Sequence, residues 1–121
     1  MKEEKREVII MTDNGTVIVP GETKMSIAEI ADLFGIYYRT AKRHIRTIEK
    51  SGIAGGDYTM ICTADGQKIY PEYYGLEMII ALAFRIQSKK AQIFRGWLCN
   101  KATRKEIPKM QVVPVQNYML N

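Results

Sequence analysis

Five cations recur within one short stretch of the sequence and are the residues best suited to bind a charged ligand. If residues 38–50 form a helix, all five fall within an arc of about 100°. The cations are Arg39, Lys42, Arg43, Arg46 and Lys50. Such a face neutralises phosphates, and Arg or Lys can reach the acceptors of guanine in a major groove. An ordinary solvated face usually mixes signs, whereas Glu49 is the one acid in this stretch.

The residues before and inside the first turn of this helix extend the candidate site. Tyr37, Tyr38 and Arg39 occupy positions that usually approach bases and backbone first, and Thr40 could contact a phosphate. His44 lies at the edge of the apolar stripe, as a packing residue or a phosphate contact. The predicted DNA-binding residues are Tyr37, Tyr38, Arg39, Thr40, Lys42, Arg43, Arg46, Lys50 and, from the next hairpin, Lys68.

Two helices joined by a tight turn position this surface. Ser26 is placed to cap a first helix, with Glu29 completing a capping box. Gly35 ends that helix, since a left-handed residue costs glycine little. The second helix closes at Ser51-Gly52. Residues 26–52 therefore predict a helix-turn-helix.

Hairpins and a helix pair surround this unit. Asp13-Asn14-Gly15 joins two β-branched runs and predicts a hairpin whose two central turn residues have positive φ. Residues 58–70 predict a second hairpin, at the place of the wing in a winged helix-turn-helix. A helix over 76–87 is expected to bury an apolar stripe, and Ser88 could cap a helix over 89–105. The predicted stripe is Leu76, Ile79, Ile80, Ala83 and Phe84.

Length, composition and charge fit this reading. The 121 residues suffice for one domain, and 46% apolar and 26% charged residues are typical of globular chains. The net charge of +5 suits a polyanionic partner. Charge is segregated: residues 26–52 carry a net +2 and residues 89–110 a net +6, separated by a segment of net −2. In the segment 85–97, Arg85, Lys89 and Arg95 could bind phosphate or buried acids.

Other function classes find little support. One His and two Cys cannot supply the four ligands of a structural zinc site, and no cofactor is expected. The sequence lacks a phosphate-cradling glycine loop, a nucleophile elbow and carboxylates paired at helical spacing, so no catalytic residue is expected. The mixed-charge N-terminus has no signal-peptide core, and no apolar run has the length of a membrane span. We expect a cytoplasmic protein that is not an enzyme.

Two segments in the second half of the chain carry a more specific pattern. They are residues 73–80, Tyr-Tyr-Gly-Leu-Glu-Met-Ile-Ile, and residues 84–98, from Phe84 to Leu98. With the turn at residues 31–36, they resemble the RhuM family of bacterial proteins over about residues 16–105. The resemblance implies a DNA-binding-like protein of genomic islands, phages and mobile elements, and it brings no established catalytic site.

The sequence thus predicts an α+β fold: a winged helix-turn-helix with an N-terminal β-hairpin and a C-terminal helix pair. Residues 1–106 form the expected domain, and residues 107–121 form a tail whose last eleven residues are uncharged. We expect a transcriptional regulator that binds double-stranded DNA through residues 38–50, as a dimer in the manner of such proteins.

Two other interpretations stay open. One is a protein-interaction module, such as an antitoxin or a mobile-element accessory factor, whose apolar tail at 111–121 adds to a partner's sheet or groove. The same tail could tie down the chain end or mediate a dimer. The other is RNA binding, in which tyrosines such as Tyr37 and Tyr38 stack on bases.

Overall fold

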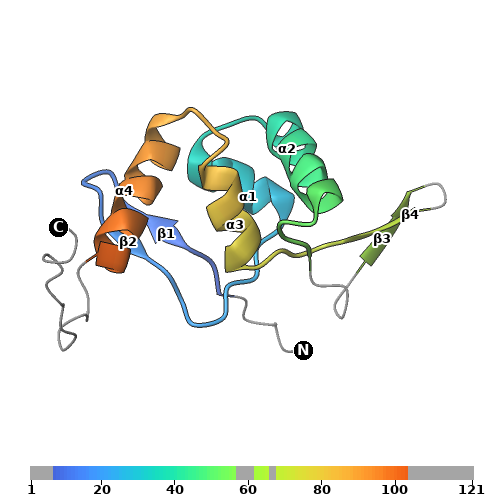
Figure 1. Ribbon diagram of the computed structural model, residues 1–121, viewed down its shortest axis with the longest axis horizontal. Coiled ribbons are helices and arrows are strands. Elements are labelled where there is room, and N and C mark those ends of the chain that lie inside the picture. Colours follow the sequence, from blue (N-terminus) through green and yellow to red (C-terminus); the bar gives the residue numbers. More distant parts are fainter. Residues whose placement is uncertain (1–6, 57–61, 66–67, 104–121) are drawn as a thin grey trace, which may run out of the picture.

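The computed structural model describes residues 7–56, 62–65 and 68–103, which form an α+β arrangement of helices and two-stranded antiparallel hairpins. The helices occupy the middle of the molecule, and the two hairpins lie on opposite sides of them (Figure 1). In chain order the elements are β1 (Ile10–Met11), β2 (Val17–Ile18), α1 (Ile27–Phe34), α2 (Tyr38–Ser51), β3 (Cys62–Asp65), β4 (Lys68–Pro71), α3 (Leu76–Ala83) and α4 (Lys89–Thr103).

Helix α1 begins and ends at the predicted residues. The Ser26 hydroxyl accepts a hydrogen bond from the Glu29 amide (3.2 Å), and the Glu29 carboxylate accepts one from the Ser26 amide (2.9 Å). Gly35 ends the helix in the left-handed region at φ 64°. This reciprocal cap and the glycine exit confirm the first half of the two-helix unit.

Helix α2 leaves the turn at Tyr38 and ends at Ser51, with Gly52 left-handed at φ 80°. Its buried residues are Ala41, Ile45 and Ile48, as the sequence predicts. They join one apolar cluster that also contains residues of α1, α3 and α4, so one face of α2 is fixed against the core.

The first hairpin forms, but its turn differs from the expected one. Only Gly15 has a positive φ, of 91°, and Asn14 does not. The Thr12 amide donates to the Thr16 carbonyl (2.9 Å), and the Gly15 amide donates to the Thr12 carbonyl (3.1 Å). The loop therefore contains three residues rather than two, and this length requires a left-handed residue only at its last position.

Helix α3 is shorter than the sequence predicts, because it ends at Ala83 instead of continuing to residue 87. The side chain of Arg95 occupies carbonyls at this end: its Nη1 donates to Ala83 (2.7 Å) and Ile86 (2.9 Å).

Phe84 is the C-cap and is 58% exposed, so its predicted burial is wrong. Met78 and Leu82 fill the core with Ile79 and Ala83, while Leu76 and Ile80 are only partly buried.

Helix α4 packs back onto α1 and α3. The Ser88 hydroxyl accepts a hydrogen bond from the Ala91 amide (3.0 Å), which confirms the predicted cap, and donates one to the Phe34 carbonyl (2.7 Å). Phe94 is buried edge-on against Phe34, with ring centroids 5.7 Å apart. The end of the predicted helix at 104–105 and the tail at 107–121 lie outside the described residues.

Strands β3 and β4 pair from Cys62–Pro71 to Asp65–Lys68, so the predicted hairpin of 58–70 extends one residue further, to Pro71. The start of that hairpin at 58–61 and its turn at 66–67 lie outside the described residues. At its base, a side chain on Gly56 would collide with Pro71 and Tyr74. Backbone hydrogen bonds in both directions join Tyr74 to Met25 (3.0 and 2.9 Å), so the chain leaving β4 is tied to the start of α1.

Candidate nucleic-acid interface

The outer face of α2 carries the predicted cations. Arg39, Arg43 and Lys50 are exposed, and Lys42 is half-buried. In the described part of the chain, none of these four side chains forms an ion pair with a carboxylate. The opposite face is buried in the core, so α2 offers uncompensated positive charge on one side only.

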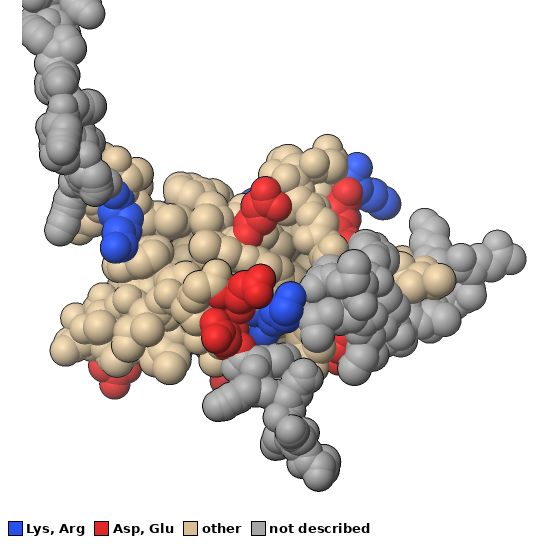
Figure 2. Space-filling view, turned by 90° about the horizontal axis from the view of Figure 1, so that it is seen from below, with Lys and Arg blue, Asp and Glu red and all other residues tan. Residues whose placement is uncertain are grey.

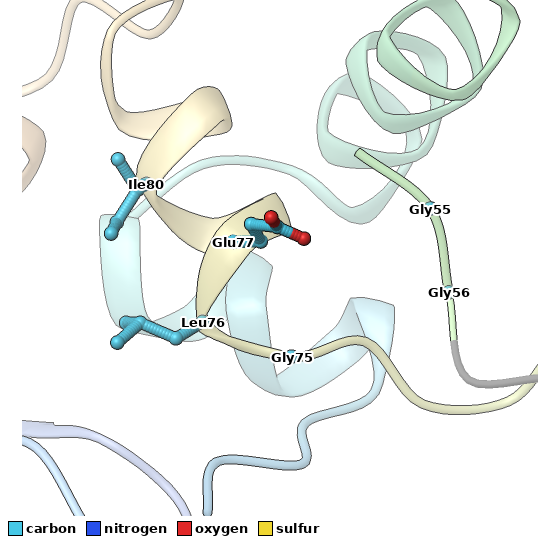
Figure 3. Close-up of a pocket in the computed structure, with 6 residues that line it drawn as sticks. All are labelled: Gly55, Gly56, Gly75, Leu76, Glu77 and Ile80. Atoms are coloured by element: carbon cyan, nitrogen blue, oxygen red, sulfur yellow. The ribbon is translucent and has the colours of Figure 1, made fainter. Parts of the chain in front are cut away.

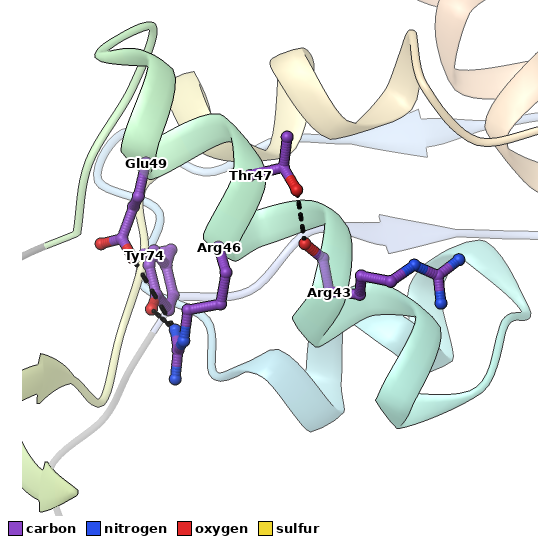
Figure 4. A network of polar contacts seen from close by, with 5 residues as sticks. All are labelled: Arg43, Arg46, Thr47, Glu49 and Tyr74. Atoms are coloured by element: carbon purple, nitrogen blue, oxygen red, sulfur yellow. Dashed lines mark hydrogen bonds and ion pairs between the residues drawn. The ribbon is translucent and has the colours of Figure 1, made fainter. Parts of the chain in front are cut away.

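Arg46 does not share this freedom, although the sequence places it on the same face. Its Nη1 donates to the Tyr74 hydroxyl (3.0 Å) and lies 3.7 Å from the Glu49 carboxylate, as Figure 4 shows. Its guanidinium carbon sits 3.6 Å from the centre of the Tyr70 ring. The side chain is only 24% exposed. Arg46 therefore links α2 to β4 and to the chain before α3, through partners that the sequence did not indicate.

The reason lies in long-range packing that a helical projection omits. Tyr74 is fully buried, yet its hydroxyl reaches the edge of α2 and needs a hydrogen-bond partner. Tyr70 reaches the same edge from β4. The sequence does show aromatic residues after the helix, but their spacing does not indicate that they contact Arg46.

The start of α2 is open to solvent. Tyr37 is 83% exposed and Tyr38 is 52% exposed, whereas Thr40 is half-buried. Tyr37 is the N-cap of the helix but makes no side-chain capping hydrogen bond. Two exposed aromatic rings beside Arg39 are thus available for stacking or apolar contact at the end of the basic face.

Beyond Arg43, the basic face meets the end of α3. Arg85 is exposed, and its Nε donates a hydrogen bond to Nδ1 of His44 (3.3 Å). Partial burial lowers the pKa of His44 below its ordinary value, and the nearby charges of Arg43 and Arg85 lower this pKa further. At neutral pH the imidazole is therefore neutral and accepts the hydrogen bond from Arg85.

The remaining predicted basic residues divide into different roles. Lys68 lies in β4 opposite Asp65, and its side chain is outside the described part of the structure. Lys89 is exposed at the start of α4. Arg95 binds the carbonyls at the end of α3, which is neither of the roles foreseen for it.

A second face of the described region differs from the cationic face of α2. The face seen in Figure 2 carries acidic and basic side chains in small groups among wide uncharged areas. An open pocket of about 470 Å³ lies between α3 and the Gly55–Gly56 segment, lined by Gly55, Gly56, Gly75, Leu76, Glu77 and Ile80 (Figure 3). None of the predicted site residues lines it. No group of three or more His, Cys, Asp or Glu side chains in the described ranges could hold a metal ion.

Comparison of the chain with models of protein families, with curated proteins and with solved structures gave no match. Within residues 7–56, 62–65 and 68–103, no helix combines the length and apolar character that crossing a membrane requires.

Proposed function

We propose that this protein binds double-stranded DNA through α2, as a helix-turn-helix protein in which the β3–β4 hairpin serves as the wing. The observation that carries the proposal is a set of four cations without carboxylate partners on one face of α2, set against an apolar face buried in the core. A helix of this kind fits the major groove, where phosphates flank it and Arg and Lys reach base acceptors.

The aromatic residues at the start of α2 support the same orientation. Tyr37 and Tyr38 project from the end of the helix that first approaches the bases in helix-turn-helix proteins. Exposing two large rings to water has no folding benefit, whereas contact with bases or sugars would cover them. Together with Arg39 and Thr40 they form the proposed base-reading end.

The position of the hairpin supports its assignment as a wing. It follows α2 directly and projects away from the helices (Figure 1). Arg46 holds it beside α2 through Tyr70 of β4 and through Tyr74. Arg46 is then a positioning residue between the helix and the wing, rather than a direct contact to DNA, and Lys68 is the wing's candidate phosphate contact.

The biological setting follows from the resemblance to the RhuM family. We infer a bacterial, cytoplasmic transcriptional regulator associated with a mobile element or genomic island, acting as a dimer. The motifs at residues 73–80 and 84–98 support this setting, and dimerisation would supply the two half-sites that such regulators read.

The direct test is the affinity of the full chain for duplex DNA as a function of salt. Phosphate contacts by the four cations without carboxylate partners predict a slope of log affinity against log salt of about −3.6 or steeper. Selection of bound sequences from random duplexes at physiological salt then tests sequence reading. A flat salt dependence would reject the proposed interface, and an absence of enrichment would restrict it to non-specific binding.

The second candidate function is a protein-interaction module, and the first hairpin gives it an observation of its own. Ile10 and Ile18 stand directly opposite each other in β1 and β2, and both are about half exposed. This apolar pair lies away from α2, so a protein partner there is compatible with DNA on the basic face. Light scattering of the Ile10→Ser variant and the wild type, each with the full chain and with the chain truncated after Lys109, tests self-association through this hairpin and the tail.

A further inference from the structure

Arg85 lies outside the two-helix unit and yet borders the basic face of α2. Helix α3 ends at Ala83, and its final carbonyl is occupied by Arg95. The chain turns there, with the Arg85 amide donating to the Leu82 carbonyl (2.9 Å). This early end brings the Arg85 side chain to α2, where its Nε meets Nδ1 of His44.

The hydrogen bond fixes Arg85 without neutralising it. Its partner is an uncharged imidazole, so the guanidinium keeps its full charge and the donors on its two terminal nitrogens. Arg43 adds a second exposed guanidinium on the same turn of α2. No carboxylate in the described residues pairs with either arginine. Both guanidinium charges act on His44. Positive charges gathered without an acid are best compensated by an anion with several acceptor oxygens.

The two flanks of α2 are therefore built differently. On one flank, Arg46 is held by Tyr70, Tyr74 and Glu49. On the other flank, Arg43 and Arg85 stay open. A helix in a major groove has a phosphate backbone on each side, and this second flank is the one that can meet a backbone directly.

We propose that Arg85, oriented by His44, forms with Arg43 a binding site for a backbone phosphate of duplex DNA. The proposal rests on the proposed function and adds to it a contact from the turn that follows α3. Arg85 would donate from its terminal nitrogens to phosphate oxygens, while its Nε remains on His44. His44 acts as a positioning residue and makes no contact with DNA itself.

The test compares Arg85→Gln with Lys101→Gln, which removes the same charge from an exposed position on α4. The probe is a mixed-sequence 25-base-pair duplex, titrated at several KCl concentrations. Arg85→Gln should weaken binding by about fivefold to tenfold at 0.1 M KCl and make the salt slope shallower by about 0.9, because one phosphate contact is lost. Lys101→Gln should leave the slope unchanged.

A double-mutant cycle tests the role of His44. His44→Ala removes the acceptor that orients Arg85, and should weaken binding in the wild-type background but have little further effect in the Arg85→Gln background. Purely structural damage would instead add to the loss. Thermal unfolding of each variant checks that the fold is retained.

The outcomes separate the two proposals. If the wild type binds the duplex and Arg85→Gln has the same affinity and salt slope, the phosphate site is wrong and the proposed function stands. If the wild type has no salt-dependent affinity for the duplex, the proposed function fails and the site fails with it. An equal loss for Lys101→Gln would also overturn the site, since the effect would then be one of net charge.

Discussion

Helices α2 and α4 are both basic, but their cations do different things. In α2, Arg39, Arg43 and Lys50 share one open face. In α4, Arg95 binds carbonyls of the α3 end, and the ammonium of Lys101 lies 5.8 Å from the centre of the Trp97 ring. These two cations of α4 therefore have contacts within the protein, unlike the exposed cations of α2.

The comparison teaches that local net charge is a poor guide to an interface. The segment at 89–110 has a higher net charge than the segment at 26–52. Binding of a polyanion depends on cations that share a face and lack internal partners. By that criterion α2 is the proposed interface, and the described part of α4 supports the fold behind it.

The largest effect is expected on duplex affinity, when a charge is reversed in α2 rather than in α4. Arg43→Glu should lower duplex affinity by roughly 100-fold or more, because it removes a phosphate contact and places a repelling charge on the open face. Lys101→Glu makes the same change in α4 and should lower affinity by less than about threefold at 0.1 M salt, since more than a Debye length of screened solvent is expected to separate it from the duplex. Fluorescence anisotropy with a labelled duplex measures both.

Equal losses for the two variants would break the comparison and assign binding to overall charge. Circular dichroism provides the control for folding, and Arg43→Glu should retain the wild-type spectrum because Arg43 is exposed.

The next largest effect is on stability, and here a change in α4 should matter more than a change in α2. Arg95→Met should lower the free energy of unfolding by about 1.5–3 kcal/mol, because the carbonyls of Ala83 and Ile86 lose a charged donor. Arg43→Met should change it by no more than about 0.5 kcal/mol, as is usual for an exposed side chain. Urea unfolding followed through the single tryptophan, Trp97, gives both values. A small effect at Arg95 would mean that water replaces its hydrogen bonds.

Local signals in the sequence predicted the elements that support α2. The capping box at Ser26, the left-handed Gly35 and the Ser88 cap each depend on residues within a few positions of one another, and all three form as expected. Local spacing also predicted the buried face of α2, because helical periodicity alone decides which of its residues share a side.

Apart from the turn of the first hairpin, the errors involve partners distant in the sequence. Arg46 is engaged by Tyr74, 28 positions away, and α3 stops early where Arg95, 12 positions beyond Ala83, takes its carbonyl. The contact between His44 and Arg85 spans 41 positions. Periodicity carries no information on such pairs, so it could predict the cationic face but could not say which cations remain open.

A smaller effect concerns the way the two helices begin. Ser88 caps α4, whereas Tyr37 at the same position of α2 has extended dihedrals but no capping hydrogen bond. Tyr37→Ser should therefore stabilise the protein by about 0.5–1 kcal/mol. The same change should weaken duplex binding, because it removes an exposed ring from the proposed base-reading end. Urea unfolding and anisotropy on one preparation measure both, and unchanged affinity would remove Tyr37 from the site.

The smallest effect is a dependence of stability on pH that arises from the flank shared by α2 and α3. The fold lowers the pKa of His44 from its ordinary value of 6.5, first through partial burial and then through Arg43 and Arg85. The unfolded chain therefore binds a proton more readily than the folded chain. Stability should fall as the pH drops below about 6.5 and level off once the pH is below the folded-state pKa, while above 6.5 this contribution is constant.

His44 is the single histidine, so this slope has one source between about pH 5 and 7, where carboxylates and the α-amino group contribute little. His44→Gln should flatten the dependence of the urea midpoint on pH in that range. Arg85→Gln should reduce it only in part, because burial and Arg43 continue to lower the pKa. If Arg85→Gln left the slope as steep as in the wild type, the charge of Arg85 would not act on His44. The proposal that His44 orients Arg85 would then lose its support.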